Sequence, residues 1–352
     1  MLFNVPVIPD EKFVEYLNRH VGSFYACHFG LYCADIDDCR HRLQFIETDR
    51  WIDFLSSVRI GRKFLLLNSR AHANQAYLDQ NHLRKVVKIL RSMLRAKVID
   101  ALVFSDAYYL QALSDAGADE ASELQAIPSI NCIPDTYGRI AAQLEFIAST
   151  RFQLPRTLLL DRSLNRRPQA LKEVSSLCRK ALPDVKIELL ANEGCLYNCP
   201  FKLTHDCHIS MLHIGQTLDT YRINRELGCM RAFQQDPSRL FKSPFIRPED
   251  VEAYEPYADV LKLCGRTLGP AFLTRVVNAY LERNYCGNLL DLMDAMEGTA
   301  RWLHVSNELL PADLLKHLLS CSRQCLDCSY CRQLIKACAK KKSLHEVLSE
   351  PG

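Results

Sequence analysis

Short apolar runs alternate along this chain with longer segments in which apolar residues recur at helical spacing. Runs of four to eight apolar residues are typical of buried strands, whereas apolar positions three and four apart predict an amphipathic helix. The segment NHLRKVVKILRSMLRAK has the helical pattern, with basic residues on its other face. Eight runs are predicted to be strands: 23–29, 63–68, 99–105, 123–130, 156–161, 185–190, 241–246 and 258–264.

Eight strands with helices between them predict an α/β fold, a (β/α)8 TIM-like barrel. The chain has 352 residues, enough for one such barrel and an appendage. The connection between the sixth and seventh predicted strands runs to roughly fifty residues, which is long for such a barrel. We therefore expect an insertion there that carries function, and we expect Cys195 to follow the sixth strand of a closed barrel.

The pattern changes after Gly265. PAFLTRVVNAYLERN and NLLDLMDAMEG predict helices, and residues 311–342 predict a helix, a cysteine-rich loop and a basic helix that ends at Lys340–Lys342 in solvent. We place a boundary near Gly269. The TIM-like barrel is then expected at 1–268 and a helical, cysteine-rich appendage at 269–352.

The composition of the chain indicates its class and location more clearly than its chemistry. Hydrophobic residues make up 48% and charged residues 24% of the chain, which is ordinary for a globular protein. The net charge of +3 permits an RNA partner but does not indicate one. No apolar run approaches the roughly 18 residues that span a bilayer, and MLFNVPVIPDEKF lacks the pattern of a signal peptide. We expect a cytoplasmic protein with no membrane contact.

Sixteen cysteines are unusual in such a protein, and they are clustered. Clustered thiols in a reducing compartment indicate metal rather than disulfides. The first cluster directly follows the predicted strand 185–190, and the second lies in the appendage. The candidate metal ligands are Cys195, Cys199, Cys207 and Cys229 in the first group, and Cys321, Cys325, Cys328 and Cys331 in the second.

Spacing leaves the metal of each cluster open. Cys195 and Cys199 form a C-x3-C pair whose thiolates suit zinc or an iron–sulfur cluster, and a structural role without metal is the alternative. Cys325-x2-Cys328-x2-Cys331 has a spacing typical of bacterial ferredoxins. These appendage cysteines could instead hold structural zinc, or complete the cluster that begins at Cys195.

In TIM barrels the reactive groups lie at the carboxyl ends of the strands, so the residues after each predicted strand are the candidates for chemistry. Acid–base residues are expected among Glu193, His205 and Asp161. The candidate substrate-binding residues are Arg162, Arg247, Arg266, Asn68 and His72, and the arginines suit a carboxylate ligand.

The motifs NEGCLYNCPF with TH after it, SPFIRPEDVEAYE, LKLCGRT and YLERNYCGNLLDLM resemble those of peptidase family 32 of the unassigned class U, the collagenase-like U32 peptidases. The likeness is to a short, single-domain branch with a C-terminal cysteine cluster. It implies a barrel with an oxygen-sensitive 4Fe–4S cluster held by four cysteines. It also implies hydroxylase-like chemistry on RNA bases or quinone precursors without molecular oxygen, with prephenate as the oxygen source.

The resemblance implies Cys195 and Cys199 as cluster ligands and Cys229 as a third. The fourth is open among Cys207, Cys264 and the four cysteines of the appendage. The sequence contains neither H-E-x-x-H nor G-x-S-x-G.

Three functions are weighed. The first is an oxygen-independent iron–sulfur enzyme, a hydroxylase-like or other redox enzyme that modifies a small molecule, a peptide or RNA and contains one or two clusters. The second is a peptidase or peptide-modifying enzyme. The third is a non-catalytic, metal-containing partner subunit.

Overall fold

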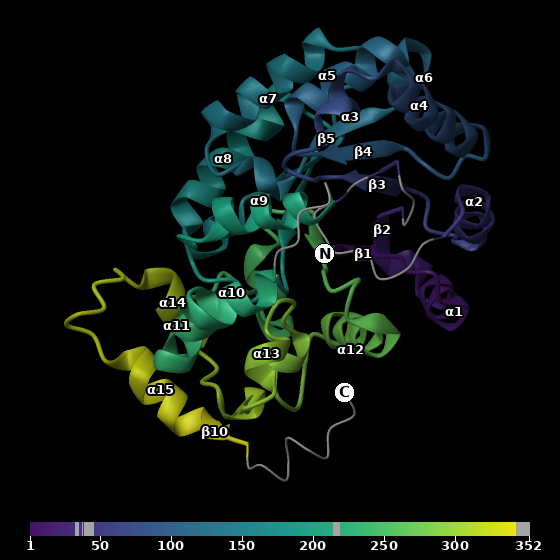
Figure 1. Cartoon of the computed structure of the whole chain (residues 1–352). Coiled ribbons are helices and arrows are strands. Elements are labelled where there is room, and N and C mark those ends of the chain that lie inside the picture. The colour runs from purple at the N-terminus through teal and green to yellow at the C-terminus, as the bar shows by residue number, and fades with distance from the viewer. Residues whose placement is uncertain (32–34, 37, 39–45, 214–218, 343–352) are drawn as a thin grey trace.

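The computed structural model describes residues 1–31, 35–36, 38, 46–213 and 219–342. Eight parallel strands form a nearly closed barrel surrounded by helices (Figure 1), which confirms the predicted (β/α)8 TIM-like fold. Along the sheet the strands follow the order β5-β4-β3-β2-β1-β8-β7-β6. Their bounds are β1 Leu2–Pro6, β2 Phe24–Phe29, β3 Lys63–Leu67, β4 Ala101–Phe104, β5 Gln125–Pro128, β6 Thr157–Leu160, β7 Lys186–Leu190 and β8 Val260–Lys262.

The seam of the barrel lies between β5 and β6. A parallel bridge between Gln125 and Gln153 joins β5 to the residues just before β6, whereas every other neighbouring pair forms a ladder. The outer helices of the first half are α1 Glu11–Arg19, α2 Thr48–Ser57, α3 Asn74–Leu78, α4 Gln80–Arg95, α5 Ala107–Ala116, α6 Ala118–Glu123 and α7 Tyr137–Ser149. Next come α8 Pro168–Ala181 and, after β8, α12 Gly269–Glu282.

The helix α4 shows why these segments form. Asp79 caps its first turn by accepting from the Asn81 N–H, and its apolar stripe of Leu83, Val86 and Leu90 is buried. Helix α12 packs on α1, where the Tyr16 hydroxyl donates to Asn278 at 2.5 Å, so it covers the barrel beside β1. The domain boundary near Gly269 stays a prediction.

One predicted strand is wrong and one strand was missed. Residues 241–246 are the end of the 3-10 helix η4 (Pro237–Lys242) and a loop, not a strand. Pro244 has no N–H for a ladder, and the carbonyls of this loop accept instead from Asn165 and Arg166. The first strand is β1, at the N-terminus, so Cys195 follows the seventh strand and not the sixth.

The long connection therefore lies between β7 and β8. It contains α9 Lys202–His213, α10 Thr220–Glu226, α11 Cys229–Gln235, η4 and the 3-10 helix η5 Pro248–Tyr254. Three further 3-10 helices, η1 Val21–Ser23, η2 Ile130–Cys132 and η3 Arg162–Arg166, follow α1, β5 and β6. Of these, η2 and η3 shape the carboxyl end of the barrel.

The appendage differs from the prediction in two places. NLLDLMDAMEG forms the 3-10 helix η6 (Leu289–Leu292) and a short α13 (Glu297–Ala300) instead of one helix. Lys340 and Lys341 lie in β10 (Ala339–Lys341), which pairs antiparallel with β9 (Leu303–Val305), so the predicted helix end there is wrong. The residues between are η7 Asn307–Leu309, α14 Leu314–Ser320 and α15 Tyr330–Cys338.

We call residues 311–342 the cysteine tail. Its helix α15 contacts η4 of the long connection, and Figure 1 shows the tail in yellow at one side of the barrel. In the part of the chain that the structure describes, no helix is both long and apolar enough to cross a membrane.

Candidate active site at the carboxyl ends of the strands

The interior of the barrel is apolar on one side and polar on the other. Phe64, Leu66, Ala101, Val103 and Ile127 of β3, β4 and β5 form an apolar cluster with Ala26. The opposite side, from β1, β2, β7 and β8, carries the buried polar residues Asn4, His28, Glu188 and Lys262. This polar side of the interior extends toward the carboxyl ends of the strands.

These four residues form one network. The Asn4 amide donates to Glu188 at 2.6 Å, and the Asn4 Oδ1 lies 2.9 Å from His28 Nδ1. Burial raises the pKa of Glu188, while Lys262 and the Asn4 hydrogen bond oppose the rise. Burial lowers the pKa of His28 well below 6.5, and the charges of Lys262 and Arg266 lower it further. The His28 ring is therefore neutral at pH 7.

Above the network lies a cavity, here called the chamber, that residues of β2, β3, β4, β6, β7 and β8 line together with α9. Its empty space, part of which is open to solvent, is about 890 Å³. The charged lining residues are four cations, Arg162, Lys202, Lys262 and Arg266, and two carboxylates, Glu193 and Asp206. Arg266 is paired with Asp38 at 2.7 Å, which still leaves one more cation than carboxylates, and this excess of positive charge favours an anionic group.

Arg162 and Glu193 form a buried ion pair at the wall of the chamber. Arg162 opens η3 directly after β6, and Glu193 follows β7, so two neighbouring strands position the pair. Arg162 also hydrogen-bonds the thiol of Cys195. Burial would lower the pKa of Arg162, but Cys195 and Asp161 raise it overall, so the guanidinium stays charged.

Helix α9 supplies a second charged pair. Lys202 Nζ lies 2.7 Å from the Asp206 carboxylate and donates to Asn131 Oδ1 at 2.9 Å, and Arg70 approaches Asp206 at 3.6 Å. Burial lowers the pKa of Lys202, as does the neighbouring charge of Arg162, while Asp206 opposes the shift. An amine with a lowered pKa in a cavity is a candidate for proton transfer.

The loop that delivers Cys195 is fixed by Asn192 and Gly194. The fully buried Asn192 side chain donates to the carbonyls of Cys264 and Leu292 and accepts from the Cys264 N–H. A Cβ on Gly194 would stand 2.1 Å from Met296 Cγ, so only glycine fits that close approach. Asn192 and Gly194, which follow the buried strand β7, therefore fix the backbone that positions Glu193 and Cys195.

Three thiols meet beside the chamber. Cys195, Cys199 and Cys229 line a second cavity together with His205, although Cys229 comes from α11. Burial raises the pKa of all three thiols, and Arg162 opposes this at Cys195 and Cys199. Cys264 lines the chamber itself. Cys207 is exposed on α9 and lines none of these cavities.

The thiols match the donor type of an iron–sulfur or zinc site, and their approach from two segments fits a shared ligand set. Within the described residues, however, no group of three or more His, Cys, Asp or Glu side chains is already arranged to hold a metal ion. The assignment of these cysteines as ligands stays a prediction.

The other predicted site residues divide into two groups. Asn68 and His205 line the chamber, and His205 Nε2 lies 3.2 Å from the Asn224 amide. Asp161 caps η3 by accepting from the Ser163 N–H, and it lines a different cavity that Cys195 and Cys199 also border.

His72 and Arg247 have partners elsewhere. His72 Nδ1 lies 3.2 Å from Asp106, and its ring packs against that of Tyr109 in a tilted arrangement with centroids 4.1 Å apart. Arg247 makes a double contact with Asp250 at 2.9 Å at the start of η5. Neither residue lines the chamber.

The sequence interpretation missed three charged residues of this site, Lys202, Asp206 and Lys262. Lys262 interrupts the apolar run ADVLKLC, and a single charge in a buried strand could have identified an inward-facing polar position. Lys202 and Asp206 are four residues apart on α9, a spacing that places them on one helix face.

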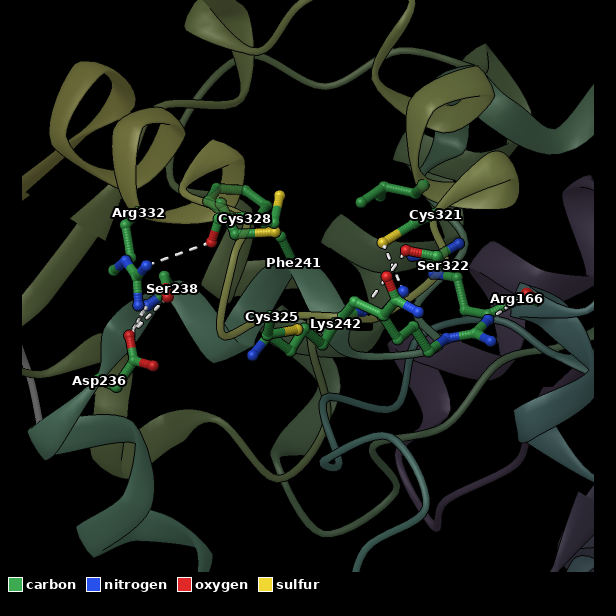
Figure 2. A pocket seen from close by; sticks show the side chains of 14 residues that line it. Arg166, Asp236, Ser238, Phe241, Lys242, Cys321, Ser322, Cys325, Cys328 and Arg332 are labelled. Carbon is green, nitrogen blue, oxygen red and sulfur yellow. Dashed lines mark hydrogen bonds between the residues drawn. The ribbon is translucent and has the colours of Figure 1, made fainter.

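The cysteine tail forms a separate site. Cys321, Cys325, Cys328 and Cys331 all line one cavity between the tail and η4 (Figure 2). None of the residues that line this cavity lines the chamber. The tail cysteines are therefore brought together with one another, but not with Cys195 and Cys199.

Comparison with known proteins finds a similar curated protein and similar solved structures. A protein of Methanocaldococcus jannaschii named "Uncharacterized protease MJ1657" is 30% identical over 187 residues, which are 53% of this chain and 54% of that protein. The chain thus spans about half the length of this curated relative. The solved structure titled "The Structure of the U32 Peptidase Mk0906" has a TM-score of 0.49 and 14% identity, over 75% of this chain and 93% of that chain.

No model of a protein family matches the chain. The name of the M. jannaschii protein, a protease, agrees with the likeness to a peptidase family that the sequence motifs indicated.

Proposed function

We propose that this chain, which resembles the U32 peptidases, is a peptidase or a related peptide-modifying enzyme whose substrate binds in the chamber. The observation that carries the proposal is the chamber at the carboxyl ends of the strands, which is lined by four cationic groups, one of them paired with Asp38, and by two carboxylates. The name of the similar M. jannaschii protein, a protease, agrees with it. An excess of positive charge suits a peptide that presents a carboxylate, either a side chain or a free C-terminus.

The residues around the chamber supply the groups that amide chemistry needs. Attack on a carbonyl requires a base for the nucleophile and donors for the oxygen that becomes negative. Glu193, His205 and the Lys202 amine are the candidate acid–base groups that face the chamber. The Arg162 guanidinium is the candidate donor, since it lies between Glu193 and Cys195.

The test uses peptides of defined ends. The full chain is incubated with a peptide mixture rich in aspartate and glutamate and with the same peptides amidated at the C-terminus, and products are identified by mass spectrometry. Wild-type protein should cleave or modify the acidic peptides, and Lys202→Met should lower the rate at least about tenfold. Lys85→Met, on the exposed face of α4, is the matched control and should keep the wild-type rate.

The absence of any new product with wild-type protein, prepared both with and without oxygen, would reject the proposal. Equal rates for wild type and Lys202→Met would instead show that the observed activity arises outside the chamber.

A second candidate is an oxygen-independent iron–sulfur enzyme of the hydroxylase-like type. The approach of Cys195, Cys199 and Cys229 to one cavity favours it, because these thiols border the chamber where a substrate such as prephenate could bind its carboxylates. A bound cluster would supply electron transfer or a Lewis-acidic iron. Arg162 and Lys202 would orient the anionic substrate, and Glu193 would hold or move a proton.

This candidate is tested on protein purified without oxygen. Iron, sulfide and an absorbance at about 400 nm in wild type, all lost in Cys195→Ser, would support it. Colourless protein without iron would reject it and leave the peptidase proposal untouched.

A further inference from the structure

The cavity of the cysteine tail combines four thiols with a positively charged surround. Cys321 precedes the loop, Cys325 and Cys328 lie within it, and Cys331 is in the first turn of α15. Figure 2 shows Cys321 and Cys328 on opposite sides of the cavity, with Cys325 between them. The cavity is also lined by Phe241 and Lys242 of η4 and by Arg166 of η3.

We infer that these four thiols bind one thiophilic metal centre, which is distinct from any centre at Cys195 and Cys199. A metal held by four thiolates carries a net negative charge, both for zinc and for a 4Fe–4S cluster. The cavity offers four basic residues, Arg166, Lys242, Arg323 and Arg332, against the one carboxylate of Asp236. Arg166 and Arg323 also donate to backbone carbonyls, and Lys242 is close enough to Cys331 to act on it electrostatically, so this surround stabilises such a centre.

The spacing of the thiols favours a cluster over zinc. All four ligands fall within the eleven residues 321–331, and three of them follow the C-x2-C-x2-C pattern of cluster-binding loops. Zinc sites with four cysteines more often use two C-x2-C pairs that are separated by about fifteen residues or more. Zinc and an iron–sulfur cluster share the same thiolate chemistry, so the experiment below distinguishes them.

The loop is built so that it can close on a metal. It joins α14 to α15, its backbone turns through a left-handed conformation at Arg323 (φ 61°), and Cys328 is exposed. Among the described residues no three ligands already surround one point, so binding draws the loop inward. Each thiol gives up its proton as it becomes a ligand.

The same loop contacts the barrel at the Cys195–Cys199 loop. The Arg323 guanidinium lies 4.4 Å from the centre of the Tyr197 ring, and it donates to the Arg166 carbonyl at the end of η3. Tyr197 stands between Cys195 and Cys199, and η3 begins with Arg162. A metal that fixes Arg323 therefore holds both of these segments of the active site in place.

Metal analysis of the full chain tests the inference. Wild type, Cys328→Ser, Cys286→Ser and Cys195→Ser/Cys199→Ser are produced without oxygen in medium with iron and zinc, and iron, zinc and sulfide are measured per chain. Cys328 is chosen because it is exposed, so serine there does not disturb the apolar core. Cys286 is an exposed cysteine outside both clusters and is the matched control.

The expected result is that Cys328→Ser loses one zinc, or about four iron and four sulfide, while Cys286→Ser and Cys195→Ser/Cys199→Ser retain that centre. Zinc without colour identifies a zinc site, and iron with sulfide identifies a cluster. Trypsin should also cut Cys328→Ser faster than Cys286→Ser after Arg323 and Arg332.

Two results would overturn the inference. The first is a metal content of Cys328→Ser equal to that of wild type. The second is one centre that is lost in both Cys328→Ser and Cys195→Ser/Cys199→Ser, which would make all these thiols ligands of a single centre. Neither result depends on peptide turnover, so failure of the proposed peptidase function leaves this test intact.

Discussion

Replacement of Asn192 by alanine is expected to be among the most destabilising single changes near the site. The Asn192 side chain is fully buried and makes three hydrogen bonds to backbone: 3.0 Å to the Cys264 carbonyl, 3.1 Å to the Leu292 carbonyl and 2.6 Å from the Cys264 N–H. Alanine leaves all three backbone groups without this partner. It also removes the side-chain link from the end of β7 to the end of β8 and to η6, and leaves only the backbone hydrogen bonds there in place.

The magnitude follows from the three groups left behind. A buried polar group without a partner costs about 1–3 kcal/mol, so three give a loss of at least about 3 kcal/mol even at the lower limit. That is a large part of a typical free energy of unfolding of about 5–15 kcal/mol. Urea unfolding at pH 7.5, followed by circular dichroism, measures the difference.

The matched control is Asn81→Ala on the exposed start of α4, which should change the free energy of unfolding by less than about 0.5 kcal/mol. The reasoning would be refuted if Asn192→Ala also fell within about 1 kcal/mol of wild type with an unchanged denaturant slope. Such a result would mean that water or neighbouring groups satisfy the three backbone groups as well as the amide does.

Three further changes test the site and its surroundings. Burial lowers the pKa of His28 below 6.5, so the stability contributed by the neutral ring is present above that pH and is lost as the pH falls. Between pH 7.5 and 5.5 the free energy of unfolding of wild type should therefore fall by about 1.4 kcal/mol more than that of His28→Gln. Parallel urea titrations that show no difference between the two proteins would contradict this. Gly194→Ala should lower the free energy of unfolding by about 1–3 kcal/mol through its clash with Met296, and the same change should cost less when it is made in a Met296→Ala background. Arg247→Ala should lower thermal stability, since it leaves the buried Asp250 carboxylate without its partner, yet it should leave peptide affinity at the wild-type value because Arg247 lies outside the chamber.

Hydrophobic periodicity predicted the barrel because each strand is buried on both faces. Seven of the eight predicted strands overlap observed strands. Short apolar runs such as KFLLLN and RTLLLD are typical of strands that are buried on both faces of a parallel sheet. The eighth, 241–246, has no partner strand among the described residues. Its carbonyls accept from Asn165 and Arg166, and contacts with residues almost eighty positions away are not visible in local periodicity.

The missed strand β1 shows the opposite limit. Its sequence LFNVP holds a polar residue in the middle and a proline at the end, which weakens the pattern of a strand. Asn4 is there because it bridges Glu188 and His28 inside the barrel. A polar residue that binds a buried carboxylate far away in the sequence therefore interrupts the apolar pattern by which its strand would be recognised.

Sequence analysis could predict those site residues whose polar or ionisable side chains directly follow a strand. Arg162, Glu193 and Cys195 each follow a correctly predicted strand, and the structure brings them into contact. Arg247 was assigned to the site because it followed the strand that does not exist, and its guanidinium instead holds Asp250. Helix α9 folds back over the barrel to bring in Lys202, and no rule of strand ends would have placed it there.

For the peptide substrate proposed above, the division of the barrel interior favours one order of groups. Over β3, β4 and β6 the chamber is lined by the apolar residues Leu66, Val103 and Leu159, while over β7 and β8 it is lined by Glu193 and Lys262. Burying apolar surface is favourable by roughly 25 cal/mol per Å², and a charge gains only where it meets a partner. A ligand therefore gains most when its apolar portion covers β3, β4 and β6 and its anionic end reaches the cations beside β7 and β8. An acidic peptide residue next to a large apolar one satisfies both walls, and exchange of their order along the peptide should weaken binding even though composition is unchanged.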